Sequence, residues 1–223
     1  MPLSRRAFLS SAASTPLAWT APKPRPNFLF ILADDLGWSD LPSYGSTFHE
    51  TPNLDRFASA SCRFTNAYSA GAVCSPTRAS IMTGRYPARI GLTDYLPGLP
   101  STGRKLKTPD DLDQLPLEET TFAEILSQHG YQTHYAGKWH LGAGPYSPLA
   151  QGFSQYIDEG DGPRDPTGGS RYTDATLKFL EQHDPSKPFF AFVSYNEVHL
   201  PLTPRQRWLP HFQEKAAALP PLS

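Results

Sequence analysis

The sequence predicts an α/β domain with a mainly parallel sheet sandwiched by helices. Two short, continuous apolar runs, residues 27–33 (NFLFILA) and 188–193 (PFFAFV), are typical of strands that a parallel sheet buries on both faces. Helical patterns alternate with such runs along the chain, which favours a parallel sheet between helical layers. The 223 residues suffice for one such domain with a sizeable core.

The first half of the chain supplies a strand and a helix. The strand over residues 27–33 follows a proline-rich linker. Thr51 is suited to cap the following helix and Pro52 to occupy its first turn. Three apolar residues share one face of that helix: Leu54, Phe57 and Ala58.

The second half repeats the alternation. Thr121 and Glu124 form a capping-box pattern at the start of a helix that Gly130 terminates. The alternating residues 131–135 (YQTHY) predict the next strand, and a helical pattern over 172–180 leads to the apolar run 188–193. Four histidines are expected at the surface or at helix ends: His49, His129, His134 and His183.

Composition excludes some partners. Twenty Lys and Arg residues against 21 Asp and Glu give a formal net charge of -1, so no basic field favours nucleic acid or an anionic membrane. The apolar stretch after the N-terminus is shorter than the about 20 residues of a membrane span. We therefore expect neither nucleic acid nor a membrane span, and any anion must be captured locally.

The N-terminus is typical of an export signal. Arg5 and Arg6 precede a short stretch rich in small residues, a pattern that resembles the signal read by the twin-arginine (Tat) export machinery. Residues 1–26 are therefore expected to be signal peptide and linker, and the protein to be periplasmic or extracellular. An oxidising destination makes a Cys62–Cys74 disulfide the simplest expectation. The sequence around Cys62 instead favours a small buried residue leading into a strand.

Three polar clusters follow predicted strands. They are Asp34 and Asp35, residues 137–142 (GKWHLG) and residues 196–199 (NEVH). Ligands of parallel sheets bind beyond the carboxyl ends of the strands, so these clusters are expected to converge. Adjacent carboxylates at a buried strand end favour a hard cation, Ca²⁺ or Mg²⁺, although a turn or cap would also use them.

Cys74 is expected at the start of a helix. Pro76 fits the first turn, and Arg78 lies one turn further on, so a group at position 74 faces the positive end of the helix. The pattern C-x-P-x-R followed by A-S-x-x-T-G-R resembles the signature of type I sulfatases, which include the arylsulfatases. In that family the cysteine is oxidised to formylglycine (3-oxoalanine).

Further segments strengthen this resemblance. NFLFILADDLGW, GRYPARIGLTDYLPG, YAGKWHLG and SYNEVHLPL are similar to family segments and occur in the family's order. The resemblance implies an alkaline-phosphatase-like α/β core, with residues 27–223 as the N-terminal part of a sulfatase catalytic domain. It also implies hydrolysis of sulfate esters of a small molecule or glycan.

The resemblance implies a role for each site residue. A maturation enzyme would convert Cys74 to formylglycine, whose hydrate supplies the nucleophile. Asp34, Asp35 and the matured residue 74 would hold Ca²⁺, with Mg²⁺ as the alternative. Arg78 would hold the formylglycine, and His140 would assist its regeneration. Lys138 and His199 would bind sulfate oxygens.

Other interpretations of these residues stay open. Lys138 taken singly could be a solvated loop charge, and His140 or His199 a structural histidine. Trp139 and Tyr195 are expected to serve packing rather than substrate binding.

The chain departs from the family pattern at its end. In family members, a later segment contributes an Asp-Asn pair to the metal site and a further lysine to the sulfate site. No Asp follows Asp184 in this chain, so the pair is absent from these residues. We therefore expect an N-terminal fragment that lacks the C-terminal part. Two alternatives to a sulfatase remain: a phosphonate or phosphate ester hydrolase on the same site, and a catalytically inactive truncated product.

Overall fold

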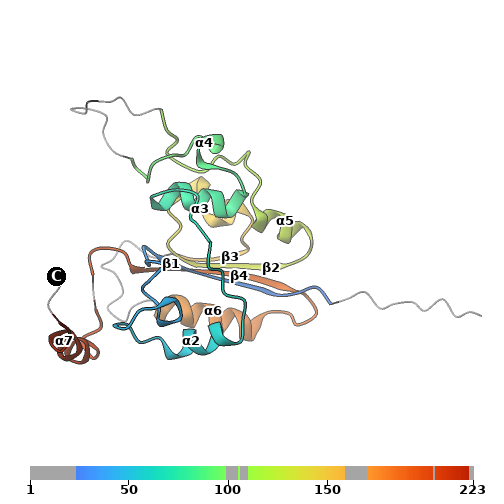
Figure 1. Cartoon of the computed structure of the whole chain (residues 1–223). Helices are drawn as coiled ribbons and strands as arrows, with labels where there is room; N and C mark the ends of the chain where they lie inside the picture. Colours follow the sequence, from blue (N-terminus) through green and yellow to red (C-terminus); the bar gives the residue numbers. More distant parts are fainter. Residues whose placement is uncertain (1–23, 99–104, 106–109, 159–169, 203, 221–223) are drawn as a thin grey trace, which may run out of the picture.

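The computed structural model describes residues 24–98, 105, 110–158, 170–202 and 204–220, so the expected export signal lies almost entirely outside the described residues. A four-stranded sheet separates two helical layers, with α3, α4 and α5 on one side and α2 and α6 on the other (Figure 1). The predicted fold class is confirmed. No helix among these residues is long and apolar enough to cross a membrane.

The strands are β1 (Phe28–Asp34), β2 (Gln132–Gly137), β3 (Gln155–Ile157) and β4 (Phe189–Val198). The α-helices are α2 (Pro52–Ser59), α3 (Cys74–Thr83), α4 (Pro87–Ile90), α5 (Phe122–Gln128), α6 (Ser170–Gln182) and α7 (Leu209–Ala217). Three short 3₁₀ helices complete the described elements: η1 (Pro42–Tyr44), η2 (Gly144–Tyr146) and η3 (Pro148–Gln151).

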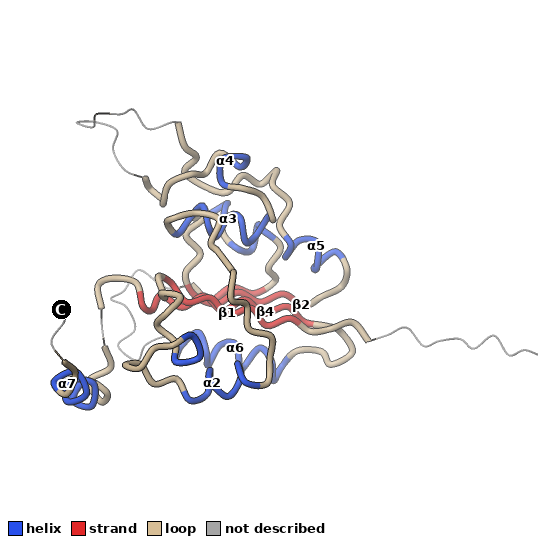
Figure 2. Tube along the Cα trace, in the orientation of Figure 1, coloured by secondary structure: helices blue, strands red, loops and turns tan. Residues whose placement is uncertain are grey.

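The sheet is parallel and has the strand order β1-β4-β2-β3 (Figure 2). Ile31 of β1 lies opposite Val193 of β4, and Tyr135 of β2 lies opposite Phe192 of the same strand. β4 therefore lies between β1 and β2. Because all strands run in the same direction, the residues that follow them meet at one edge of the sheet.

The main core lies between the sheet and the layer of α3 and α5. Phe190 packs against Phe122 with ring centroids 4.8 Å apart, and Phe192 stacks on Tyr135 at 5.0 Å. Each such fully buried side chain contributes roughly 1.5–3 kcal/mol to stability. A smaller cluster joins the other face of the sheet to α6: Ala136, Tyr172 and Val193.

The sequence patterns at the two ends of α5 predicted this helix correctly. The Thr121 hydroxyl accepts a hydrogen bond from the Glu124 N–H at 3.1 Å, and the Glu124 carboxylate accepts one from the Thr121 N–H at 2.7 Å. This is the predicted capping box. Gly130 has φ +80°, the left-handed conformation that ends a helix at low cost with glycine.

The expected burial of the first strand was wrong. β1 is an edge strand, because β4 is its only partner among the described residues, and Ile31 is 60% exposed. Leu54 and Phe57 of α2 are also exposed, at 49% and 71%. A continuous apolar run predicts a buried strand, but it does not predict which element covers that strand.

Two further expectations were wrong. Cys62 is exposed, and the residues after it form no strand, because nothing pairs with them in the described structure. Neither cysteine forms a disulfide. His134 is buried on β2 rather than at the surface: its ring stacks on Phe179 at 4.7 Å, and its Nε2 lies 3.3 Å from the Thr176 hydroxyl.

Candidate functional site

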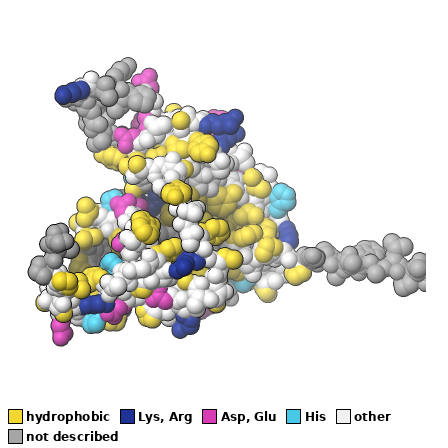
Figure 3. All heavy atoms as spheres, in the orientation of Figure 1, with side chains coloured by type: hydrophobic (Ala, Val, Ile, Leu, Met, Phe, Trp, Pro, Cys, Tyr) yellow, Lys and Arg dark blue, Asp and Glu magenta, His cyan; other side chains and the backbone are white. Residues whose placement is uncertain are grey.

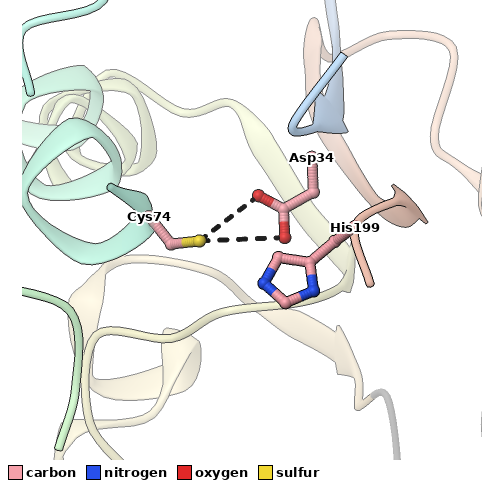
Figure 4. Close-up of side chains that lie close together, drawn as sticks. All are labelled: Asp34, Cys74 and His199. Atoms are coloured by element: carbon pink, nitrogen blue, oxygen red, sulfur yellow. Dashed lines mark hydrogen bonds between the residues drawn. The ribbon is translucent and has the colours of Figure 1, made fainter. Parts of the chain in front are cut away.

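Three chain segments converge at the carboxyl edge of the sheet. Asp34 is the last residue of β1, Lys138 directly follows β2, and His199 directly follows β4. Cys74 is the first residue of α3 and faces the same edge. Figure 4 shows Asp34, Cys74 and His199 turned toward one another. A cavity of about 230 Å³ beside them is lined by Asp34, Asp35, Cys74 and Arg78, among others.

Asp34 lies at the centre of the charges. Its buried carboxylate forms an ion pair with the Lys138 ammonium, and its Oδ1 lies 3.4 Å from Nη2 of Arg78. Burial alone would raise the pKa of Asp34, but the hydrogen bond from Lys138 and the charges of Arg78 and Lys138 outweigh it. The pKa is therefore lowered from its ordinary value, and the carboxylate stays ionised.

Arg78 is fixed by two strong hydrogen bonds. Its Nη1 donates to the Lys138 carbonyl at 2.6 Å and to the Ser194 hydroxyl at 2.7 Å, and its side chain is buried. A planar guanidinium held this way has one orientation, which points Nη2 at Asp34. Sequence reasoning missed Ser194. A lone hydroxyl inside the apolar run of β4 was the signal that could have found it.

The close approach of β2 to β4 depends on Gly137. Its φ is +105°, and a Cβ built there would lie 1.9 Å from the Ser194 carbonyl oxygen. Any side chain would force the two strands apart at this point. The Lys138 N–H, one residue on, donates to that same carbonyl at 3.0 Å.

Cys74 lies between the Asp34 carboxylate and the Lys138 ammonium group. Its thiol donates to the Asp34 carboxylate, with Sγ–Oδ distances of 3.5 and 4.0 Å, and accepts from the Lys138 ammonium at 3.4 Å. Burial raises the pKa of the thiol, Lys138 lowers it and Asp34 raises it, with a net increase over the ordinary value. The thiol therefore stays protonated and is not an activated thiolate.

His199 closes the other side of the site. Its Nε2 lies 3.7 Å from a carboxylate oxygen of Asp35. Ligand atoms of Asp34, Cys74 and His199 all lie within 4.8 Å of one another, close enough to hold a metal ion. Asp35 is not part of that cluster, and its side chain is largely exposed.

His140 belongs to a neighbouring hydrogen-bonded loop. Its Nε2 lies 2.6 Å from the Leu96 carbonyl oxygen, and the Leu96 N–H donates to the Ser75 hydroxyl at 3.1 Å. The Asp111 carboxylate holds the same loop by accepting from the N–H groups of residues 93 and 94 at 2.6 and 2.7 Å. Sequence reasoning missed this loop, because its contacts join residues far apart in the chain.

Two aromatic residues occupy packing positions, as expected. Trp139 is buried in the main core, and its indole N–H donates to the Tyr146 carbonyl at 2.9 Å. The Tyr195 hydroxyl lies 2.7 Å from the Thr173 hydroxyl of α6.

The profile of the sulfatase family matches residues 26–219. The chain belongs to the sulfatase family. It is 43% identical over 152 residues to arylsulfatase A of Bos taurus, a match that covers 67% of this chain and 27% of that protein. It is 33% identical over 230 residues to N-acetylgalactosamine-6-sulfatase of Rattus norvegicus, covering 86% of this chain and 43% of that protein.

Solved structures give the same result. Ps i-CgsB, in complex with k-i-k-neocarrahexaose, matches 86% of this chain and 49% of its own at a TM-score of 0.69 and 26% identity. BT4656, in complex with its substrate D-glucosamine-2-N,6-O-disulfate, matches 90% of this chain and 40% of its own at 0.69 and 28% identity. The chain therefore spans between a quarter and a half of the length of these relatives.

Proposed function

We propose that the sulfatase domain to which these residues contribute hydrolyses sulfate esters, with the nucleophile derived from Cys74. The observation that carries the proposal is the placement of Cys74 at the first residue of α3, between Asp34 and Lys138, with its thiol protonated. A protonated thiol is a poor nucleophile, so the position needs another species to act. Oxidation to formylglycine by a maturation enzyme supplies one, an aldehyde whose hydrate carries two hydroxyl groups on the former Cβ.

The donor groups fit a hard divalent cation. The Sγ atom of Cys74 marks where oxygens of the hydrated formylglycine would lie, beside the ionised Asp34. Each carboxylate oxygen has two lone pairs, so Asp34 can keep Lys138 and Arg78 and still bind a metal. We propose that Asp34, Asp35 and residue 74 hold Ca²⁺, or alternatively Mg²⁺. When bound, the ion lowers the pKa of a hydrate hydroxyl and polarises the sulfate.

The reaction proceeds in two steps, a displacement at sulfur and then an elimination at the former Cβ. One hydroxyl at position 74 attacks sulfur, the bond from sulfur to the ester oxygen breaks, and the alcohol leaves with a proton. The second hydroxyl then loses its proton, the bond from carbon to the sulfate oxygen breaks, and the aldehyde forms again. Water adds to the aldehyde and restores the hydrate.

The surrounding side chains assist these steps. Lys138 and His199 bind sulfate oxygens and neutralise charge on the leaving oxygen. His140 accepts the proton in the second step: its bond to the Leu96 carbonyl keeps a proton on Nε2, so Nδ1 is the nitrogen that can accept one. Arg78 orients Asp34 and thereby the nucleophile.

We further propose a sulfated sugar as the substrate and export as the destination. The substrate proposal is supported by the sugar ligands of the two solved relatives and by the name of the rat relative. The export proposal is supported by Arg5 and Arg6 and the small-residue stretch after them, which resemble the signal recognised by the Tat machinery.

Mass spectrometry tests the nucleophile directly. When the chain is made together with a formylglycine-generating enzyme, the Cys74 peptide should lose SH₂, gain an oxygen and react with a hydrazide, whereas Cys62 should stay a thiol. An unmodified Cys74 under these conditions would remove the proposed nucleophile.

Turnover tests the reaction. The protein with Cys74 converted to formylglycine should release sulfate from a sulfated sugar faster than phosphate from the matching phosphate ester. Cys74→Ala should abolish turnover, and the control Cys62→Ala should not. Faster phosphate release would favour the phosphate ester hydrolase instead.

A further inference from the structure

Residue 74 carries a sulfur atom until it is converted, and this sulfur lies among other metal-binding atoms. Asp34, Cys74 and His199 each offer one ligand atom, and these three atoms lie within 4.8 Å of one another (Figure 4). They are a carboxylate oxygen, a thiol sulfur and an imidazole nitrogen. Sulfur and imidazole ligands favour Zn²⁺, whereas Ca²⁺ and Mg²⁺ bind oxygen ligands. The ligand chemistry of the site therefore differs before and after the conversion of Cys74.

The spacing of the sulfur and the carboxylate fits a tetrahedral ion. Zn²⁺ binds sulfur at about 2.3 Å and carboxylate oxygen at about 2.0 Å, which places the two ligand atoms about 3.5 Å apart at a tetrahedral angle. Sγ of Cys74 lies 3.5 Å from Oδ1 of Asp34. Asp34 ends β1 and is buried, and Cys74 begins α3, so regular secondary structure positions both residues. These two ligands are already at the separation that a bound zinc ion requires.

The neutral His199 ring presents the nitrogen that a metal needs. Its Nδ1 lies 2.6 Å from the Leu200 carbonyl oxygen, which can only accept a hydrogen bond, so Nδ1 carries the proton and Nε2 has the lone pair. Zinc-binding histidines usually donate their other N–H to a carbonyl or carboxylate in this way. The His199 side chain is 32% exposed and directly follows β4. A shift of roughly 1 Å brings its ligand nitrogen to the separation that a tetrahedral ion requires.

The charges around the cluster tolerate a divalent ion. The positive charges of Lys138 and Arg78 face the negative charges of Asp34 and Asp35. Binding Zn²⁺ with loss of the thiol proton therefore adds one net positive charge. The Lys138 ammonium donates a hydrogen bond to the sulfur at 3.4 Å and stabilises its thiolate form. The side chains of Asp35 and His199 are 58% and 32% exposed, so an ion can enter from solvent. Acidic and histidine side chains lie next to one another on the molecular surface in Figure 3.

We propose that the chain with Cys74 still a thiol binds one Zn²⁺ through Sγ of Cys74, Nε2 of His199 and a carboxylate oxygen of Asp34, with water as the fourth ligand. The thiol proton leaves to solvent as the bond from sulfur to zinc forms, and no electron is transferred. This set differs from the oxygen set proposed for the converted protein, because it contains sulfur and His199 and omits Asp35. Conversion of Cys74 therefore changes the metal preference of the site from zinc to a hard cation.

Metal titration of the unconverted chain tests the proposal. The chain would be made without a maturation enzyme, with Co²⁺ as a spectroscopic substitute for Zn²⁺. One equivalent of Co²⁺ should give the visible bands of a four-coordinate ion and a sulfur-to-cobalt charge-transfer band, and Zn²⁺ should abolish both. Cys74→Ser and His199→Ala should each weaken Zn²⁺ binding about a hundredfold, since even changes next to a metal ligand cost about 10–100-fold. The control Cys62→Ala, at an exposed thiol, should bind like the parent chain.

Alkylation of the parent chain tests the site without a variant. One equivalent of Zn²⁺ should slow the reaction of Cys74 with iodoacetamide and leave that of Cys62 unchanged. Four results would overturn the proposal: absence of the charge-transfer band, its loss in Cys62→Ala, parent-like Zn²⁺ binding by Cys74→Ser or His199→Ala, or equal alkylation of Cys74 with and without Zn²⁺. All measurements use the protein before conversion, so their failure is distinct from failure of the catalytic proposal.

Discussion

Replacing Lys138 by methionine should destabilise the folded chain by about 3 kcal/mol, because it leaves the buried carboxylate of Asp34 without its closest cation. The side chains of Lys138 and Asp34 are 8% and 7% exposed, so water does not screen the pair. Removing one partner of a buried pair costs about 3–5 kcal/mol. Arg78 keeps Nη2 at 3.4 Å from Asp34, which places the expected loss at the lower end of that range.

The pH dependence of this loss follows from Asp34. Its pKa in the folded chain lies below the ordinary value of 3.8, so its pairing stabilises the fold above pH 3.8 and stops doing so as pH falls through the folded-state pKa. The difference between parent and Lys138→Met should therefore be largest near pH 7 and shrink as the pH falls, since burial raises the pKa of Asp34 once Lys138 is removed.

Urea unfolding with a chelator present measures the difference. The matched control is Lys187→Met, because Lys187 pairs with Asp184 at 3.9 Å with both side chains well exposed. Exposed pairs contribute about 0–1 kcal/mol. If Lys138→Met behaves like this control, the pair at the site is not the buried, coupled pair described above.

Three other predictions concern separate parts of the chain. Burial lowers the pKa of His134 to about 4 from 6.5, so stability should fall by about 2 kcal/mol from pH 7.5 to pH 5 as the unfolded state takes up the proton. His134→Phe should flatten that change in urea unfolding, and an equally steep curve would assign it elsewhere. Asp111→Ala should release the loop that holds His140, detected by ¹⁵N NMR as loss of the single Nε2-protonated tautomer, whereas an unchanged spectrum would show that the loop is held without Asp111. Replacing Arg5 and Arg6 by lysine should leave folded protein in the cytoplasm, and fractionation showing unchanged export would contradict the proposed signal.

The convergence of the site could be predicted from sequence because it follows from strand direction. Asp34 ends one strand of a parallel sheet, and Lys138 and His199 directly follow two others, so the three residues had to meet at the same edge. Pro76 likewise indicated that Cys74 begins a helix. These are local signals combined with one rule of topology.

The parts that could not be predicted depend on contacts between distant residues. Ser194 anchors Arg78 across 116 positions of sequence, and Leu96 reaches His140 across 44. No local pattern encodes such pairs. The exposed edge of β1 was missed for the same reason. An apolar run predicts that a strand is buried, but it does not identify the residues that cover the strand.

The two cations around Asp34 have a consequence for the order of events in making the protein. A buried carboxylate that depended on a divalent ion would leave the chain unable to close until the ion arrived. Here Lys138 and Arg78 already balance that charge from within the polypeptide. The charge of Asp34 is therefore balanced before any metal ion binds, and the geometry around this carboxylate is set by the polypeptide itself.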